Sequence, residues 1–169
     1  VDWCYKTEPD ETMNNRSIRY PRGKTLGGSS AINGLLYIRG QSRDYDVWRQ
    51  LGNTGWGWDD VLPYFIKAEN QERGKDDYHG VGGPLSVSDQ RIKLPLLNEF
   101  QNAAEEFGIP KTQDFNTGDN HGCGYFQVTE KDGFRCSTAV GYLNPIKNRN
   151  NLKIITNAHV KKINFENKT

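Results

Sequence analysis

The stretch RGKTLGGSSAINGLLYIRG, residues 22–40, contains the glycine-rich loop that is most informative about this chain. Gly27 and Gly28 lack a Cβ atom, and two hydroxyl residues, Ser29 and Ser30, follow them directly. A loop of this kind can bring backbone N–H groups close to phosphate oxygens. The stretch therefore makes a phosphate-containing ligand one of the hypotheses to test.

Three further polar side chains accompany this loop. Arg22 and Lys24 could neutralise negative charge, and Asn33 follows Ser30 by about one helical turn, so it could project toward the same ligand. The glycine spacing is neither G-x-x-x-x-G-K-[ST] nor G-x-G-x-x-G, the two common nucleotide-binding patterns. On these residues alone, a ligand-binding loop and a tight turn before a buried helix both stay open. Residues 31–40 suit either a short helix or a buried strand.

The composition excludes some classes of function. The 22 Lys and Arg residues against 21 Asp and Glu residues give a net charge of +1 over 169 residues, which offers no electrostatic argument for a nucleic acid or an anionic membrane as partner. No stretch approaches the roughly 18 consecutive apolar residues of a transmembrane helix. The three cysteines, Cys4, Cys123 and Cys136, form no C-x-x-C pair, and a Cys123–Cys136 disulfide and free thiols both stay open. Because both ends look cut, we expect a fragment of a longer protein.

Hydrophobic periodicity and capping residues predict a mixture of helices and strands. Helices are expected over residues 43–51, 60–70, 94–107 and 138–143, with Ser42, Asp59 and Ser137 as N-caps and Pro63 in a first turn. Strands are expected over residues 85–88 and 125–128 and as two short runs within 152–165, with a turn at 132–133. The other segments are expected to be an extended arm over 1–22, a mobile surface loop over 70–84 and a loop over 109–124.

Several blocks of the sequence resemble one enzyme family. Residues 22–40 are similar to the first sequence signature of the glucose–methanol–choline (GMC) flavin oxidoreductases. The resemblance continues, in family order, through Asp44-Tyr45-Asp46 with Trp48, residues 55–65, residues 82–85, residues 135–145 and Asn157-Ala158-His159-Val160. The blocks span nearly the whole chain, and their residue pattern is most similar to those of insect-type glucose dehydrogenases and of choline dehydrogenases.

The resemblance implies an enzyme that binds FAD and oxidises an alcohol carbon. By matching position it assigns cofactor contacts to the glycine loop and to one distant residue: Gly27, Gly28, Ser29, Ser30, Asn33, Gly34, Leu36 and Val160. Some family members attach FAD covalently through a histidine of this loop. The matching position here is Ile32, which has no nucleophile, so we expect FAD to be bound non-covalently.

The resemblance also implies an α/β fold, in which a dinucleotide-binding domain for FAD is joined to a substrate or cap domain built on an antiparallel sheet. Both are incomplete in this chain, which by itself reads as α+β. Residues 1–58 are expected to belong to the FAD-binding domain and residues 59–150 to the substrate or cap domain. Residues 151–169 are expected to form strands that return to the FAD-binding domain.

The chain offers no candidate for the base that alcohol oxidation requires. The family's catalytic histidine, with its histidine or asparagine partner, lies near the C-terminus of the family's sequences. We expect His79 to be solvated in the mobile loop, His121 to lie on the surface or to face a substrate channel, and His159 to have a packing or polar role. No catalytic or metal-binding residue is assigned, and the fragment alone is expected to be inactive.

The leading interpretation is an FAD-dependent oxidoreductase acting on an alcohol or a sugar such as glucose, with a quinone or oxygen as electron acceptor. One alternative is a non-catalytic homologue that keeps FAD or ligand binding. Another is a carbohydrate-binding module built on Trp48, Trp56 and Trp58, which otherwise pack between a loop and a helix. Localisation stays open, although the sequons at Asn15 and Asn167 favour a secreted protein.

Overall fold

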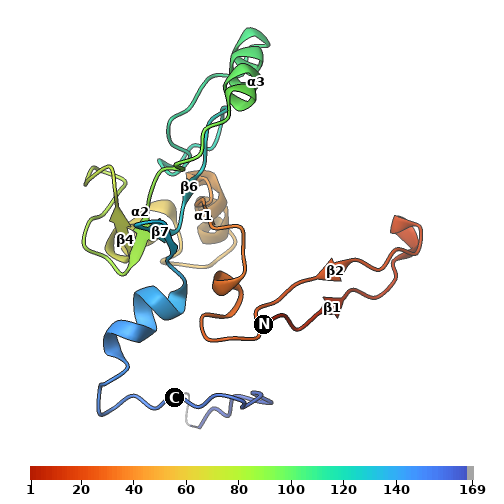
Figure 1. Cartoon of the computed structure of the whole chain (residues 1–169), viewed down its shortest axis with the longest axis vertical. Coiled ribbons are helices and arrows are strands. Elements are labelled where there is room, and N and C mark those ends of the chain that lie inside the picture. Colours follow the sequence, from red (N-terminus) through yellow and green to blue (C-terminus); the bar gives the residue numbers. More distant parts are fainter. Residues whose placement is uncertain (167–169) are drawn as a thin grey trace.

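A computed structural model describes residues 1–166, in which short helices are interspersed with short strands (Figure 1). The helices are α1 (Ser42–Gln50), α2 (Trp58–Ala68) and α3 (Pro95–Glu106). The strands are β1 (Tyr5–Lys6), β2 (Arg19–Tyr20), β3 (Leu36–Tyr37), β4 (Glu69–Gln71), β5 (Leu85–Val87), β6 (Gln127–Val128), β7 (Glu130–Lys131) and β8 (Phe134–Arg135). Shorter helical turns lie at Glu11–Met13, Gly28–Ala31, Ala139–Leu143 and Asn144–Ile146. The mixture of helix and strand confirms the predicted fold class, and none of the described helices is long and apolar enough to cross a membrane.

The strands pair two by two. β1 with β2, β3 with β6, and β7 with β8 are antiparallel, whereas β4 and β5 are parallel. A bridge between Ser88 and Val128 connects the β4–β5 pair to the β3–β6 pair. The small apolar core lies at this connection and consists of Val87, Phe115, Val128 and Cys136. All three cysteines are free thiols.

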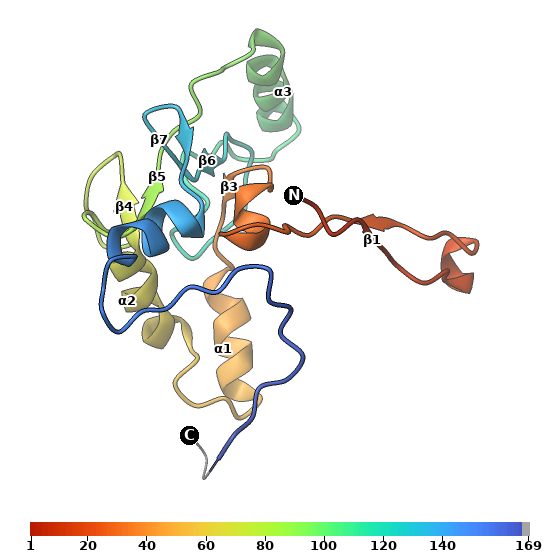
Figure 2. The same cartoon turned by 60° about the horizontal axis from the view of Figure 1, so that its bottom comes forward.

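The predicted extended arm is confirmed. β1 and β2 form a ladder that projects from the rest of the molecule in both views (Figures 1 and 2). Asp10 caps the helical turn at its tip by accepting a hydrogen bond from the backbone N–H of Thr12 at 2.8 Å. Asn15 is exposed near that tip, whereas the sequon at Asn167 lies outside the described residues.

Helices α1 and α2 form close to their predicted positions, each with a carboxylate in its first turn. The Asp44 carboxylate accepts a hydrogen bond from the backbone N–H of Gln41, and the Asp60 carboxylate accepts one from that of Gly57, both at 2.9 Å. The N-caps are therefore Gln41 and Gly57 instead of the predicted Ser42 and Asp59. Because α2 begins earlier than predicted, Pro63 lies inside the helix and not in its first turn.

An aromatic cluster joins α1 to α2. The ring of Tyr45 lies 5.4 Å from that of Trp48, 5.7 Å from that of Trp58 and 5.7 Å from that of Phe65. Trp48 in turn lies 5.9 Å from Trp56. Such tilted and edge-to-face contacts between rings stabilise the packing of a loop against two helices. The contacts agree with the packing interpretation of the tryptophans.

Helix α3 occupies its predicted position, and Gly108 ends it with a left-handed φ of 93°. It stands at one end of the molecule (Figures 1 and 2). Its apolar stripe is exposed, with Phe100 66% and Phe107 87% accessible to solvent. The periodicity thus identified the helix, but no described part of the chain covers its apolar face.

The prediction of a mobile surface loop over residues 70–84 is wrong in part: residues 72–84 form no helix or strand and are mostly exposed, but Asn70 and Gln71 belong to β4 and His79 and Gly80 are buried. β4 pairs with β5, and the backbone N–H of Gln71 donates to the carbonyl of Gly80 at 2.8 Å. Gly80 packs so closely that a Cβ there would collide with the carbonyl of Ile66. The segment looks polar because its buried side chains are polar, and their partners lie in other segments of the chain.

The prediction of two strands within residues 152–165 is also wrong, since this segment has no regular secondary structure. Its apolar side chains are exposed, including Ile163 at 70% and Phe165 at 77%. A strand requires a partner for its backbone groups. No described strand pairs with this segment, so the alternating pattern has no ladder to join.

Candidate functional site

The glycine loop forms a tight turn whose conformation depends on its glycines. Gly27 and Gly28 have φ angles of 88° and 54°, and a helical turn over Gly28–Ala31 follows. Gly23 packs against the loop so closely that a Cβ there would collide with the carbonyl of Gly28. Residues 31–40, which suited a helix or a strand, contain the end of this turn and then β3.

The predicted contact residues of the loop present an open face. Ser29, Asn33, Gly34 and Leu36 are exposed, and no atom lies within 4 Å of where a Cβ would be at Gly34. Ser30 is different, because its hydroxyl donates to the Gly27 carbonyl at 2.5 Å and accepts the backbone N–H of Thr138 at 2.9 Å. The Ser30 side chain is thus used to hold the loop, and Ser29 Oγ also accepts the backbone N–H of Gly23 at 3.3 Å, although Ser29 stays exposed on the open face.

A cleft of about 710 Å³ lies beside the start of this loop. One wall is formed by Gly23–Leu26 and the other by Ile155–His159, more than 120 residues later in the chain, and Trp3 contributes a ring. Lys24 Nζ lies 4.6 Å from the centre of that ring, and the His159 ring lies 5.6 Å from it. The walls of the cleft directly precede Gly27 and Val160, two of the predicted contact residues, and Lys24 places a cation in one wall, but none of the eight predicted contact residues lines the cleft itself. Val160 directly follows one wall and is 76% exposed.

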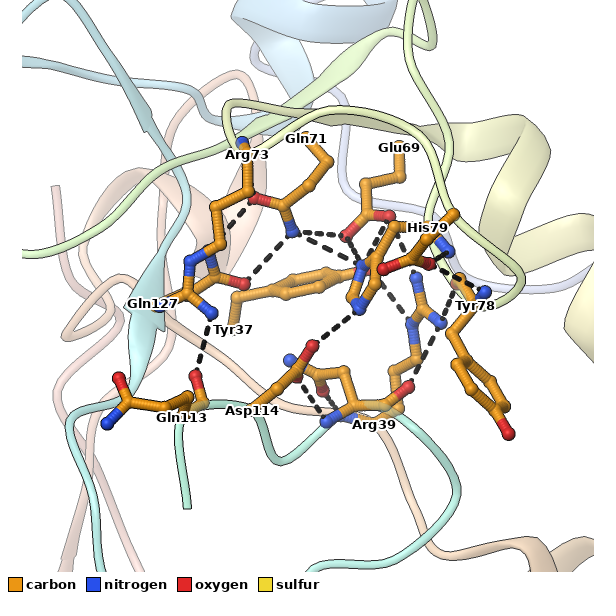
Figure 3. Close-up of polar contacts among 12 residues, drawn as sticks. Tyr37, Arg39, Glu69, Gln71, Arg73, Tyr78, His79, Gln113, Asp114 and Gln127 are labelled. Atoms are coloured by element: carbon orange, nitrogen blue, oxygen red, sulfur yellow. Dashed lines mark hydrogen bonds and ion pairs between the residues drawn. The ribbon is translucent and has the colours of Figure 1, made fainter. Parts of the chain in front are cut away.

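A second polar cluster, the buried charge network, was not foreseen. It joins Arg39, Glu69, Gln71, His79, Asp114 and Gln127 (Figure 3). The side chains of Arg39 and Glu69 are 1% and 0% exposed, and Arg39 Nη2 lies 3.0 Å from Glu69 Oε2. The network ties β4 and the loop over residues 109–124 to residue 39, at the end of the glycine-loop stretch.

His79 lies between two carboxylates, contrary to the prediction that it is solvated. Its Nδ1 is 3.0 Å from Glu69 Oε2 and its Nε2 is 2.7 Å from Asp114 Oδ2, and the side chain is 2% exposed (Figure 3). Burial alone lowers the pKa of His79, but the hydrogen bonds to Asp114 and Glu69 outweigh it and raise the pKa to about 9. An imidazolium at neutral pH donates from both ring nitrogens, so His79 serves as a cationic link between Glu69 and Asp114.

The pKa values of two other groups around the network are also shifted, that of Asp114 downward and that of Tyr37 upward. Burial alone raises the pKa of Asp114, yet hydrogen bonds from His79 and from the Asn116 backbone bring it below its ordinary value. Burial raises the pKa of the Tyr37 phenol to about 12, and its oxygen accepts a hydrogen bond from Arg39 Nε at 3.2 Å. Within the described residues, no group of histidine, cysteine and acidic side chains is arranged to hold a metal ion. The network consists of ion pairs and amide hydrogen bonds that hold distant segments together.

The charge on His79 makes stability depend on pH. Because its pKa rises from 6.5 in the unfolded chain to about 9 on folding, its contribution is complete below pH 6.5 and is lost as the pH rises through 9. We expect the free energy of unfolding to fall by about 3 kcal/mol between these limits. Urea unfolding, followed by tryptophan fluorescence from pH 6 to 9.5, measures this slope. His79→Gln, which cannot titrate, should remove most of it, and an unchanged slope in that variant would contradict the assignment.

Of the three histidines, the other two lie where predicted in general terms. His121 is exposed in the loop over residues 109–124, and His159 packs edge-on against Trp3 although it lies in no strand. The buried network was missed because Glu69 and Asp114 lie 10 and 35 residues from His79, and no local spacing links them. Arg135 lies in residues 135–145, one of the stretches that resemble the family, and it contacts the glycine loop, a role that the sequence analysis did not predict.

Comparison with known proteins identifies the family. The model of the GMC oxidoreductase family matches residues 9–169. The chain is 44% identical to an alcohol dehydrogenase [acceptor] of Pseudomonas putida and 42% identical to an oxygen-dependent choline dehydrogenase of Sinorhizobium fredii, over 99% and 98% of its length. Its structure superposes on an FAD-dependent oxidoreductase from Chaetomium thermophilum with a TM-score of 0.80 and 28% identity, over 86% of this chain and 28% of that chain.

This chain corresponds to less than a third of the length of these relatives. The chain spans 31% of the length of the Pseudomonas relative and 30% of that of the Sinorhizobium relative. The family model covers the glycine loop, the buried charge network and the wall of the cleft at Ile155–His159 alike. The chain therefore belongs to the GMC oxidoreductase family.

Proposed function

We propose that this chain is part of a longer enzyme that binds FAD non-covalently and oxidises the CH–OH group of an alcohol. The observation that carries the proposal is the cleft between Gly23–Leu26 and Ile155–His159, whose walls directly precede Gly27 and Val160, two residues that the family resemblance assigns to FAD. The family membership and the name of the Chaetomium relative support the cofactor, and the names of the two dehydrogenases support the reaction class.

The cleft and the loop fit an extended, anionic cofactor. Lys24 places a positive charge on one wall, and the neighbouring turn exposes backbone where Gly28 and Gly34 leave open space. Glycine permits such a close approach because it has no side chain. The proposed contact set is Gly27, Gly28, Ser29, Ser30, Asn33, Gly34, Leu36 and Val160. Ser30 contributes by shaping the loop, as its hydroxyl is engaged within the protein.

Bound FAD supplies the acceptor for the hydride that leaves the alcohol carbon. This chain's residues bind and orient the cofactor and exclude water from its contact face. None of the histidines in the chain is assigned to proton abstraction, and His79 in particular is buried and paired with Glu69 and Asp114. Ile32 stands where covalent members have a histidine, which supports non-covalent binding.

The proposal also includes the domain boundaries, the substrate, the electron acceptor and the localisation. Residues 1–58 and 151–169 belong to the FAD-binding domain and residues 59–150 to the substrate or cap domain. The substrate is an alcohol or a sugar such as glucose, as for an enzyme of the insect glucose dehydrogenase type, and the electrons pass to a quinone or to oxygen. Asn15, exposed on the arm, supports the proposal of a secreted protein.

Anaerobic titration of the full-length holoprotein with alcohols tests the reaction class. Glucose, choline and a simple primary alcohol are added separately, and flavin absorbance near 450 nm is followed. Bleaching by one of them, with recovery on adding a quinone or oxygen, is expected. A flavin that no alcohol bleaches, but that dithionite does, would instead support the non-catalytic homologue, for which FAD binding alone remains.

A further inference from the structure

Arg135, at the end of β8, reaches the glycine loop from a distant part of the sequence. Its Nη1 donates to Asn33 Oδ1 at 2.6 Å and to the carbonyl of Ser30 at 3.2 Å. Asn33 lies 102 residues earlier in the chain. A hydrogen bond from a charged donor is short and stronger than a neutral one, so Arg135 fixes the position of the Asn33 side chain.

The contacts of Asn33 determine which way its amide faces. Oδ1 accepts from Arg135 and also from the backbone N–H of Leu35 at 3.1 Å. Both partners are donors only, so the oxygen must face them and the Nδ2 hydrogens must point elsewhere. Asn33 is exposed, and among the described residues its Nδ2 has no hydrogen-bond acceptor. Its two donors are therefore available on the open face of the loop.

The backbone after Asn33 depends on the same arrangement. Leu35 has a φ of 68°, a left-handed conformation that costs a side-chain-bearing residue on the order of 1–3 kcal/mol. Its N–H is held by Asn33 Oδ1, and its carbonyl accepts from the Thr129 backbone N–H at 2.8 Å and from Thr129 Oγ1 at 3.2 Å. The turn thus needs Asn33 to keep its oxygen toward Leu35, which is the orientation that Arg135 enforces.

A second contact from the same segment holds the preceding turn. The backbone N–H of Thr138 donates to Ser30 Oγ at 2.9 Å, and Thr138 Oγ1 donates to the Gly27 carbonyl at 3.2 Å. Thr138 thus holds Gly27 and Ser30, and Arg135 holds Ser30 and Asn33, so the two residues bind the loop on both sides of the Gly28–Ala31 turn. We name this pair of contacts the loop clasp.

We propose that Arg135 is a positioning residue for the cofactor site, which acts through Asn33. The clasp holds the Asn33 amide so that its Nδ2 donors face an acceptor atom of the bound cofactor, whose isoalloxazine ring offers carbonyl oxygens and ring nitrogens. This inference rests on the proposed FAD site. It adds a specific role for a residue on the β7–β8 hairpin, which touches the cofactor only through the loop.

The test measures the dissociation constant for FAD of the full-length apoprotein by flavin fluorescence quenching. Arg135→Met and Asn33→Ala should each weaken binding about tenfold, since one charge-assisted or ligand-directed hydrogen bond is removed. The double variant should bind FAD within about twofold of Asn33→Ala alone, because Arg135 then has no amide to position. Lys131→Met, on the same hairpin with an exposed side chain, is the matched control and should bind as the wild type does.

Asn33→Asp separates positioning from donation. Aspartate keeps an acceptor for Arg135 and Leu35 but has no donors, so FAD binding should fall while the thermal unfolding temperature of the apoprotein stays at the wild-type value. If Arg135→Met does not fold, Arg135→Lys, which keeps the charge without the guanidinium geometry, should show a partial loss.

Two results would overturn the inference while leaving the proposed function intact. One is a wild-type protein that binds FAD and an Arg135→Met variant that binds it equally well. The other is a double variant whose loss is the product of the two single losses, which would mean that Arg135 acts independently of Asn33. A wild-type apoprotein that does not quench flavin fluorescence would overturn the proposed function, and this inference with it.

Discussion

Replacement of Glu69 by glutamine is expected to lower the free energy of unfolding by about 3–5 kcal/mol, because it breaks a buried ion pair from one side. Glu69 Oε2 lies 3.0 Å from Arg39 Nη2 and 3.0 Å from His79 Nδ1, and it also accepts the backbone N–H of Gly80 at 3.0 Å. With the carboxylate gone, the buried Arg39 guanidinium keeps its charge without its partner. That loss is a large share of the 5–15 kcal/mol by which domains are usually stable.

The matched control for this variant is Glu72→Gln, three residues along the chain. Glu72 also pairs with an arginine, Arg91, but both side chains are accessible to solvent. An exposed pair of this kind contributes about 0–1 kcal/mol. Urea unfolding of both variants should therefore separate them clearly. Equal losses would contradict the account of the buried charge network as a fold-stabilising link.

A methyl group at Gly23 is expected to weaken flavin binding strongly. The Cβ of Gly23→Ala would collide with the carbonyl of Gly28 and lie 2.8 Å from the backbone nitrogen of Ser29, so the loop must move. Backbone overpacking of this kind costs about 3 kcal/mol, which corresponds to roughly a hundredfold loss of affinity if the displaced loop is the cofactor site. The FAD dissociation constant of the full-length protein measures this directly.

Gly34→Ala provides the contrast. A Cβ at Gly34 has no atom within 4 Å, and its backbone is not in the left-handed region, so the apoprotein should keep its stability within about 0.5 kcal/mol. The added methyl projects onto the open face, so FAD binding should still weaken. Normal FAD binding by Gly23→Ala would contradict the role assigned to the loop, whatever Gly34→Ala shows.

Local patterns were sufficient for the elements that depend on local interactions. The helix over Pro95–Glu106 and the turn at residues 132–133 were predicted because apolar spacing and an Asp-Gly pair act within a few residues. The glycine loop was singled out for the same reason. Its two glycines have positive φ angles, as a tight turn between ligand-facing residues requires.

The failures concern elements that depend on distant partners. Residues 72–84 are the loop that their polar composition suggests, but Gln71 and His79 are buried against groups that come from elsewhere in the sequence. Residues 152–165 alternate as strands do, but pattern alone cannot supply a pairing strand. Arg135 shows the same limit at the candidate site, since nothing within its own block of sequence points to Asn33.

The flavin content of the full-length protein as purified tests the proposed FAD site directly. We expect an absorbance band near 450 nm with about one FAD per chain, and full release of unmodified FAD into the supernatant after acid or heat denaturation. Flavin that stays with the precipitated protein would contradict non-covalent binding. A protein that shows no flavin band, and gains none after incubation with FAD, would contradict the assignment of the glycine loop and its neighbouring cleft as the cofactor site.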